Sequence, residues 1–282
     1  METRHIAVIN ESANINPGDF AKAVAAVQRQ ITEDFGPIWD VAATLAAVPS
    51  LDDKPFGYWP VVVRDEIGIN EPGVHLTEAG DKPFALVLFT GHDWTITLSH
   101  ELLELVVDPL GTDFRQGPSV RDDQGVVEYL AEVCDPCQSD QCAYPVNGDQ
   151  LVSDFVTPAY YGGFGPGQYS FRGHISAPRQ VLVGGYVTWR DPLTGKLWQA
   201  FDVGEGTEFR NVPPEALRPD VHLRGAVDRD TARALARRRK GARKRRPSAQ
   251  PRQLRQRMGP YAAARAEAAW WRRQIDRADA TP

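Results

Sequence analysis

The sequence lacks the long apolar run that a membrane-spanning helix needs. None of its 282 residues falls in a stretch that approaches about 18 consecutive apolar residues. The N-terminus has neither the apolar core nor the cleavage site of a secretory signal, and no internal repeat is present. These absences exclude a membrane span and a solenoid. We therefore expect a cytoplasmic protein with no membrane partner.

Basic residues are scarce in the first 223 residues and abundant after them. Residues 1–223 hold 14 Lys and Arg against 32 Asp and Glu, a net charge of −18, whereas residues 224–282 hold 18 against 5, a net charge of +13. Residues 224–258 have no apolar face, so we expect a disordered basic tail. Such a tail fits nucleic-acid phosphates, an acidic protein surface, or solvent alone. Because no aromatic residues lie among its arginines, base stacking is not expected.

The rest of the sequence predicts an α+β fold, with a mixed sheet near the N-terminus and a β-rich lower half. Apolar runs predict strands at residues 6–9, 39–48, 59–67 and 83–89, a helix from residue 17 and a hairpin over 180–201. A second helix is expected within residues 93–109, with Thr95 or Thr97 as its N-cap and Pro109 at its end. We divide the chain into a domain at 1–223, a basic flexible linker at 224–260 and a short C-terminal helix at 261–282.

The second helix carries the clearest chemical motif. His100 and Glu104 are four residues apart, so on a helix they share one face. Enzymes with an HExxH motif present two ligands to one zinc ion in this way, and zinc also accepts carboxylate oxygen. Glu101 lies beside the expected ion and is the candidate general base. The competing interpretation is a surface helix that contains Glu because Glu is a good helix former.

The string SHELLELVVDP at Ser99–Pro109 resembles the HExxExxxDP helix of poorly characterised bacterial and phage zincin-like proteins. Ala131–Pro136 resembles the acidic segment that follows in such proteins, and Val152–Thr157 is similar too. The resemblance covers residues 55–190. It implies a zincin fold, a metallopeptidase activity, and an edge strand at 83–89 that binds an extended substrate. The chain departs from proven metallopeptidases because Glu104 replaces their second histidine.

The resemblance also bears on the third metal ligand. Zincins with similar separations take that ligand from a later segment, which favours Glu132 and leaves Glu128 in reserve. Asp108 lies eight residues after His100, about 12 Å along a helix axis. It is therefore awkward as a ligand of the same ion, and a turn or capping role fits it better.

Other residues leave alternatives open. Cys134, Cys137 and Cys142 could bind a second zinc ion with His174 as fourth ligand, form a disulfide, or remain ordinary thiols. His75 and His92 flank the strand at 83–89 and could reach the mouth of a site. Candidate stabilisers of an oxyanion are Tyr160, Tyr161 and His174, each of which could equally be structural.

We expect a zinc-dependent hydrolase of the peptidase type. In this hypothesis His100, Glu104 and Glu132 hold one Zn²⁺ ion, and Glu101 is the general base that activates water. The alternative is a non-catalytic structural or binding protein of a phage or mobile element. Its metal site would be degenerate, and its basic tail would bind nucleic acid or a protein partner.

Overall fold

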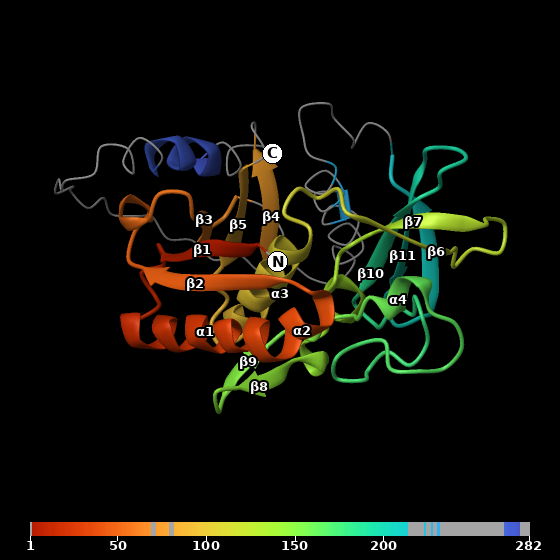
Figure 1. Cartoon of the computed structure of the whole chain (residues 1–282), viewed down its shortest axis with the longest axis horizontal. Coiled ribbons are helices and arrows are strands. Elements are labelled where there is room, and N and C mark those ends of the chain that lie inside the picture. The colour runs from red at the N-terminus through yellow and green to blue at the C-terminus, as the bar shows by residue number, and fades with distance from the viewer. Residues whose placement is uncertain are drawn as a thin grey trace.

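The protein is described here by a computed structural model that places residues 2–68, 72–78, 82–213, 223, 227, 230, 231 and 268–276. The fold is mixed α+β, as the sequence predicts, with two five-stranded sheets and a small two-stranded one in the described part (Figure 1). Most of the predicted basic tail and linker lies outside the described residues.

The first sheet is mixed and uses the apolar runs of the N-terminal half. Its strands, in spatial order, are β2 (Ala42–Val48), β1 (Thr3–Asn10), β3 (Trp59–Arg64), β5 (Lys82–Leu88) and β4 (Gly73–Glu78). The first four are parallel, and β4 runs antiparallel to β5. The prediction that residues 83–89 form the edge strand is wrong, because β5 pairs with β3 on one side and with β4 on the other. The edge is β4, a strand that the sequence analysis did not predict.

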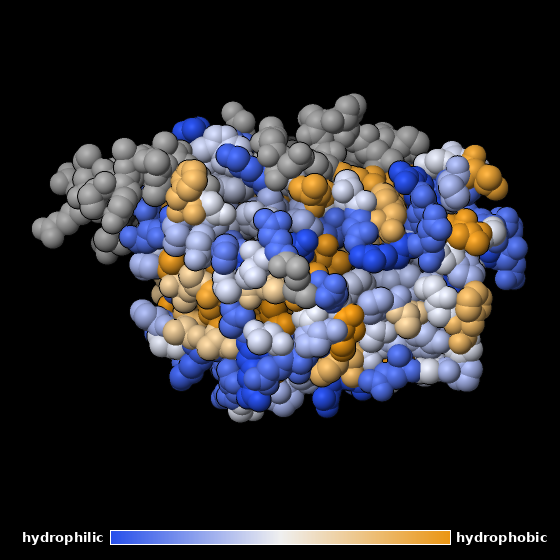
Figure 2. All heavy atoms as spheres, in the orientation of Figure 1, coloured by the Kyte–Doolittle hydropathy of each residue, from blue (hydrophilic) through white to orange (hydrophobic). Residues whose placement is uncertain are grey.

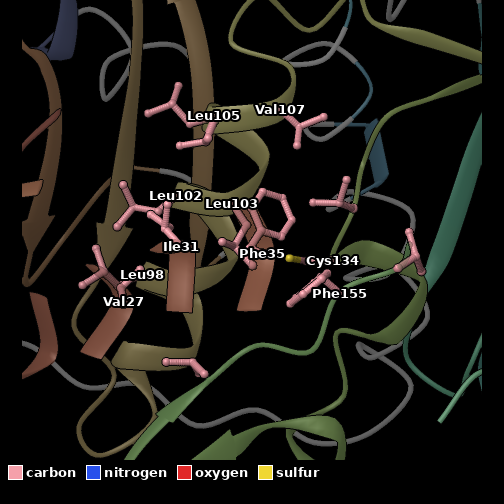
Figure 3. Close-up of a cluster of buried hydrophobic side chains, with 14 of the residues drawn as sticks. Val27, Ile31, Phe35, Leu98, Leu102, Leu103, Leu105, Val107, Cys134 and Phe155 are labelled. Carbon is pink, nitrogen blue, oxygen red and sulfur yellow. The ribbon is translucent and has the colours of Figure 1, made fainter. Parts of the chain in front are cut away.

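Helices α1 (Pro17–Arg29) and α3 (Trp94–Val107) pack on one face of this sheet. Asn16 is the N-cap of α1, and its side chain accepts a hydrogen bond from the Asp19 amide, as expected of a good N-cap. A π-helical turn (Gln30–Phe35) and the short α2 (Gly36–Trp39) follow it. Helix α3 ends before Pro109, as predicted. Figure 3 shows the leucines of α3 packed among Val27, Ile31 and Phe35.

The second sheet is antiparallel and forms the β-rich half. Its strands, in spatial order, are β12 (Thr207–Asn211), β11 (Leu197–Asp202), β10 (Tyr186–Arg190), β7 (Val126–Leu130) and β6 (Phe114–Pro118). The hairpin β8 (Tyr144–Val146) and β9 (Gln150–Val152) and the short α4 (Ala159–Gly162) lie between β7 and β10 in the chain. The predicted hairpin is confirmed as β10 and β11. One continuous core joins both sheets through α3.

A C-terminal segment, residues 268–276, is helical and covers the other face of the first sheet. Its stripe of Ala268, Trp271 and Ile275 is buried against strand residues that include Phe84. The rings of Trp271 and Phe84 meet edge to face at 5.7 Å. These nine residues lie within the segment 261–282, for which a helix is expected, and they cover this face of the sheet.

The structure describes three residues of the predicted linker, and all three contact the second sheet. Gln199 donates a hydrogen bond to Thr231, Arg210 pairs with Asp230 at 2.6 Å, and Val227 is buried. On the face in Figure 2, hydrophilic residues cover most of the surface and apolar residues lie in small groups between them. None of the helices that the structure describes is both long and apolar enough to span a bilayer.

Candidate metal centre

Buried polar contacts fix helix α3 in place. The Ser99 hydroxyl donates a hydrogen bond to Gln30 at 2.6 Å and accepts one from the Ser153 amide at 3.1 Å. Gln30 in turn donates to Tyr144 and to the Ser153 carbonyl. A buried network with its members bonded to one another favours one arrangement of its elements. The face of α3 that bears His100, Glu101 and Glu104 is thereby held toward β4 and the segment after β7.

His100, Glu104 and Asp135 bring their ligand atoms together. Nε2 of His100 lies 3.3 Å from Oε2 of Glu104 and 3.1 Å from Oδ1 of Asp135. All three atoms lie within 4.8 Å of one another. A tetrahedral zinc ion with bonds of about 2.0–2.1 Å separates its ligand atoms by about 3.3 Å. One imidazole and two carboxylates at these separations fit such an ion.

A backbone hydrogen bond joins the segment that carries Asp135 to helix α3. The Cys134 amide donates a hydrogen bond to Oε1 of Glu104 at 3.1 Å, so one oxygen of Glu104 is held and Oε2 faces His100. The 3₁₀ turn Asp135–Cys137 begins at the next residue. Glu104 and Asp135 are buried, with exposures of 0% and 1%. This arrangement orients both carboxylates, as outer contacts do in metal sites.

Strand β4 supplies a second set of contacts to α3. Alternate residues of a strand face the same way, and Gly73, His75 and Thr77 all face the helix. Nδ1 of His75 lies 3.6 Å from Oε2 of Glu101 and 3.7 Å from Oε2 of Glu104. A Cβ atom on Gly73 would lie only 2.5 Å from Oε1 of Glu101. Glycine at this position therefore gives the Glu101 carboxylate its space.

The charges around His100 favour its protonated form when no metal is bound. Burial by itself lowers the pKa of His100, but the charges of Glu104 and Asp135 and their hydrogen bonds outweigh it. The net effect raises the pKa of His100 well above 6.5. A metal ion at this position takes the place of that proton, because only the neutral imidazole binds a metal.

A small cavity opens beside the group. Its volume is about 100 Å³, so it has room for water. Gly73, Thr97, His100, Glu101 and Asp135 line it, together with Pro72, Ile96, Gln138, Asp140 and Tyr186. Glu101 therefore lies where a water molecule beside the proposed ion would be.

The other predicted ligands lie elsewhere. Glu132 is buried. Burial raises the pKa of Tyr161, and the charge of Glu132 adds to that effect, but Glu132 belongs to neither group of ligand atoms found among the described residues. Glu128 pairs with Arg190 at 2.7 Å on the second sheet. Asp108 accepts a hydrogen bond from the Thr112 amide at 2.8 Å, which is the turn role expected of it.

The cysteines and the candidate oxyanion stabilisers also lie outside the cavity. The three cysteines are free thiols and form no three-ligand group within the described chain. Burial and neighbouring carboxylates raise the pKa of Cys134 and Cys137 well above 9.0. Tyr160 donates to the Gln180 carbonyl, Tyr161 donates to the Glu132 carbonyl, and His174 pairs with Asp154. These contacts tie the three side chains to other parts of the fold. His92, which could have reached the mouth of a site, is exposed.

Sequence reasoning missed Asp135 as a ligand, and it named His75 only as a residue that could reach the mouth of a site. Asp135 lies in the acidic segment 131–136 that the resemblance singled out, three residues after Glu132. Distance along the chain cannot choose between them, because the choice depends on the Cys134 contact to Glu104. His75 was considered a loop residue. The signal for a strand was the alternation of Val74 and Leu76 with polar neighbours.

No protein-family model matches the sequence, and no curated protein is significantly similar to it.

Proposed function

We propose that the protein is a metal-dependent hydrolase of the peptidase type. The observation that carries the proposal is the convergence of His100, Glu104 and Asp135 at metal-binding separations. Glu101 lines the same cavity as His100 and Asp135. Asp135 replaces Glu132 as the proposed third ligand. A bound zinc ion would lower the pKa of water, as it does in enzymes with three protein ligands and one open position.

The residues of the chain have separate roles in this proposal. His100, Glu104 and Asp135 hold the ion, and the Cys134 amide keeps Glu104 oriented. Glu101 accepts a proton from water in the cavity and returns it to the leaving amine. Tyr186 lines the same cavity and can donate a hydrogen bond to a developing negative charge. The sequence-based candidates Tyr160 and Tyr161 do not line it.

The first test compares the wild type with Glu101→Gln and His100→Ala. Zinc content is measured after loading, and hydrolysis is followed by mass spectrometry on a mixture of unstructured peptides. We expect zinc in the wild type and in Glu101→Gln, but not in His100→Ala. Removal of a general base costs roughly 10²–10⁴-fold in rate, so Glu101→Gln should lose hydrolysis by that factor.

A different result would favour the binding-protein alternative. If the wild type holds zinc but hydrolyses no peptide, the site is structural and the hydrolase proposal fails. If it holds no metal at all, the metal centre itself fails. The basic segment 224–258, mostly outside the described residues, would then become the first place to seek binding to nucleic acid or acidic protein.

A further inference from the structure

We propose that the centre holds two divalent ions, with a second ion bound by His75, Glu101 and Glu104. The ligand atoms of these three side chains lie within 4.8 Å of one another, as those of His100, Glu104 and Asp135 do. All three of these side chains are buried, with exposures of 1%, 6% and 0%. This inference rests on the proposed metal centre, because the two groups share Glu104.

The two groups are distinct positions for ions. Two ligand atoms of one zinc ion lie at most about 4.2 Å apart, twice the bond length. The five side chains separate into two groups even at 4.8 Å, so one ion cannot be bound by all of them. Oε2 of Glu104 lies 3.3 Å from Nε2 of His100 and 3.7 Å from Nδ1 of His75. This oxygen therefore faces both positions and can bridge two ions.

Charge is compatible with a second cation. With both imidazoles neutral, the five side chains carry three negative charges in the interior. One divalent ion leaves a charge of −1 among them, whereas two ions leave +1, which a hydroxide or a substrate carboxylate can offset. Ions that share a carboxylate in hydrolases lie about 3.5–4 Å apart and bind both the attacking oxygen and the substrate.

Glu101 can serve both the second ion and water because its two oxygens face different ways. Oε2 lies 3.6 Å from Nδ1 of His75, on the side of the second ion. Oε1 lies against Gly73, which lines the cavity. The second ion would thus bind Oε2 and leave Oε1 as the proton acceptor. One imidazole and two carboxylates suit Zn²⁺ or Mn²⁺.

The test is the zinc stoichiometry of the full chain, measured by elemental analysis after equilibration with excess zinc and removal of free ions. The variants are His75→Gln and, as a control, His92→Gln, which changes an exposed histidine of the neighbouring loop. We expect two equivalents in the wild type and in His92→Gln, and one equivalent in His75→Gln. Circular dichroism checks that each variant is folded.

If His75→Gln does not fold, the paramagnetic resonance spectrum of Mn²⁺ bound to the wild type tests for the second ion instead. Two ions bridged by one carboxylate give a coupled paramagnetic resonance spectrum, whereas one ion gives an isolated six-line spectrum. One equivalent in the wild type would overturn the second site and leave the proposed function standing. Two equivalents retained in folded His75→Gln would also overturn it. No bound metal would instead overturn the proposed function.

Discussion

Gly73→Ala should disturb the centre through one methyl group. The new Cβ would lie 2.5 Å from Oε1 and 2.8 Å from Cγ of Glu101, and 2.6 Å from Cγ2 of Thr97. Ordinary contacts begin near 3.4 Å, so β4 or the Glu101 side chain must move by about 1 Å. Overpacking of this kind costs about 1–3 kcal/mol. A displacement of about 1 Å in a catalytic group can also slow a reaction about 100-fold.

The matched control is Gly125→Ala. Gly125 has no heavy atom within 4 Å of its Cβ position and no positive φ, so alanine there should be neutral or stabilise by about 0.4–1 kcal/mol. Urea denaturation of both metal-free variants measures the free energy of unfolding, and peptide hydrolysis measures the effect on Glu101. Equal stability of the two variants would refute the reasoning, since the close approach of β4 to α3 would then carry no cost.

Three further predictions follow from the structure. Asp135→Asn should weaken zinc binding by more than the roughly 10–100-fold that is typical of changes outside the ligand shell, whereas Glu132→Gln should leave zinc affinity unchanged. Competition with a chelator measures both affinities. A larger loss of affinity in Glu132→Gln than in Asp135→Asn would restore Glu132 as the ligand. Trp271→Ala should lower the free energy of unfolding, measured in urea, by about 3–5 kcal/mol. A loss below about 1 kcal/mol would show that the C-terminal helix is not docked on the first sheet. The raised pKa keeps the Cys134 thiol neutral at pH 7, and the thiolate is the reactive form. An alkylating reagent should therefore modify Cys134 only after the protein unfolds, which mass spectrometry can follow. Rapid alkylation of the native protein would contradict the burial of this thiol.

Local patterns were sufficient to predict four of the five strands of the first sheet and the two long helices on it. The apolar β-branched run at 6–9 is β1, and residues Phe20, Val24 and Val27, at helical spacing, are buried on α1. Pro109 correctly marked the end of α3. These elements follow the periodicity of their own side chains. Strand β4 was missed because its inward residues are Gly73, His75 and Thr77, none of which has the apolar character of a core strand.

The centre was only partly predictable for a related reason. His100, Glu101 and Glu104 share one helix, so spacing alone places them together. Asp135 and His75 come from a turn and an edge strand, and their approach to α3 depends on tertiary contacts such as the Cys134 amide to Glu104. A C-terminal helix was predicted at 261–282, but the surface that it covers was not, because that depends on which face of the assembled sheet is left open.

The central claim, a metal ion held by nitrogen and oxygen atoms of His100, Glu104 and Asp135, is tested most directly by X-ray absorption on the zinc-loaded wild type. The account predicts nitrogen and oxygen neighbours at about 2.0–2.1 Å and no sulfur. A shell of sulfur atoms at about 2.3 Å would place the zinc at the cysteines instead and contradict the account.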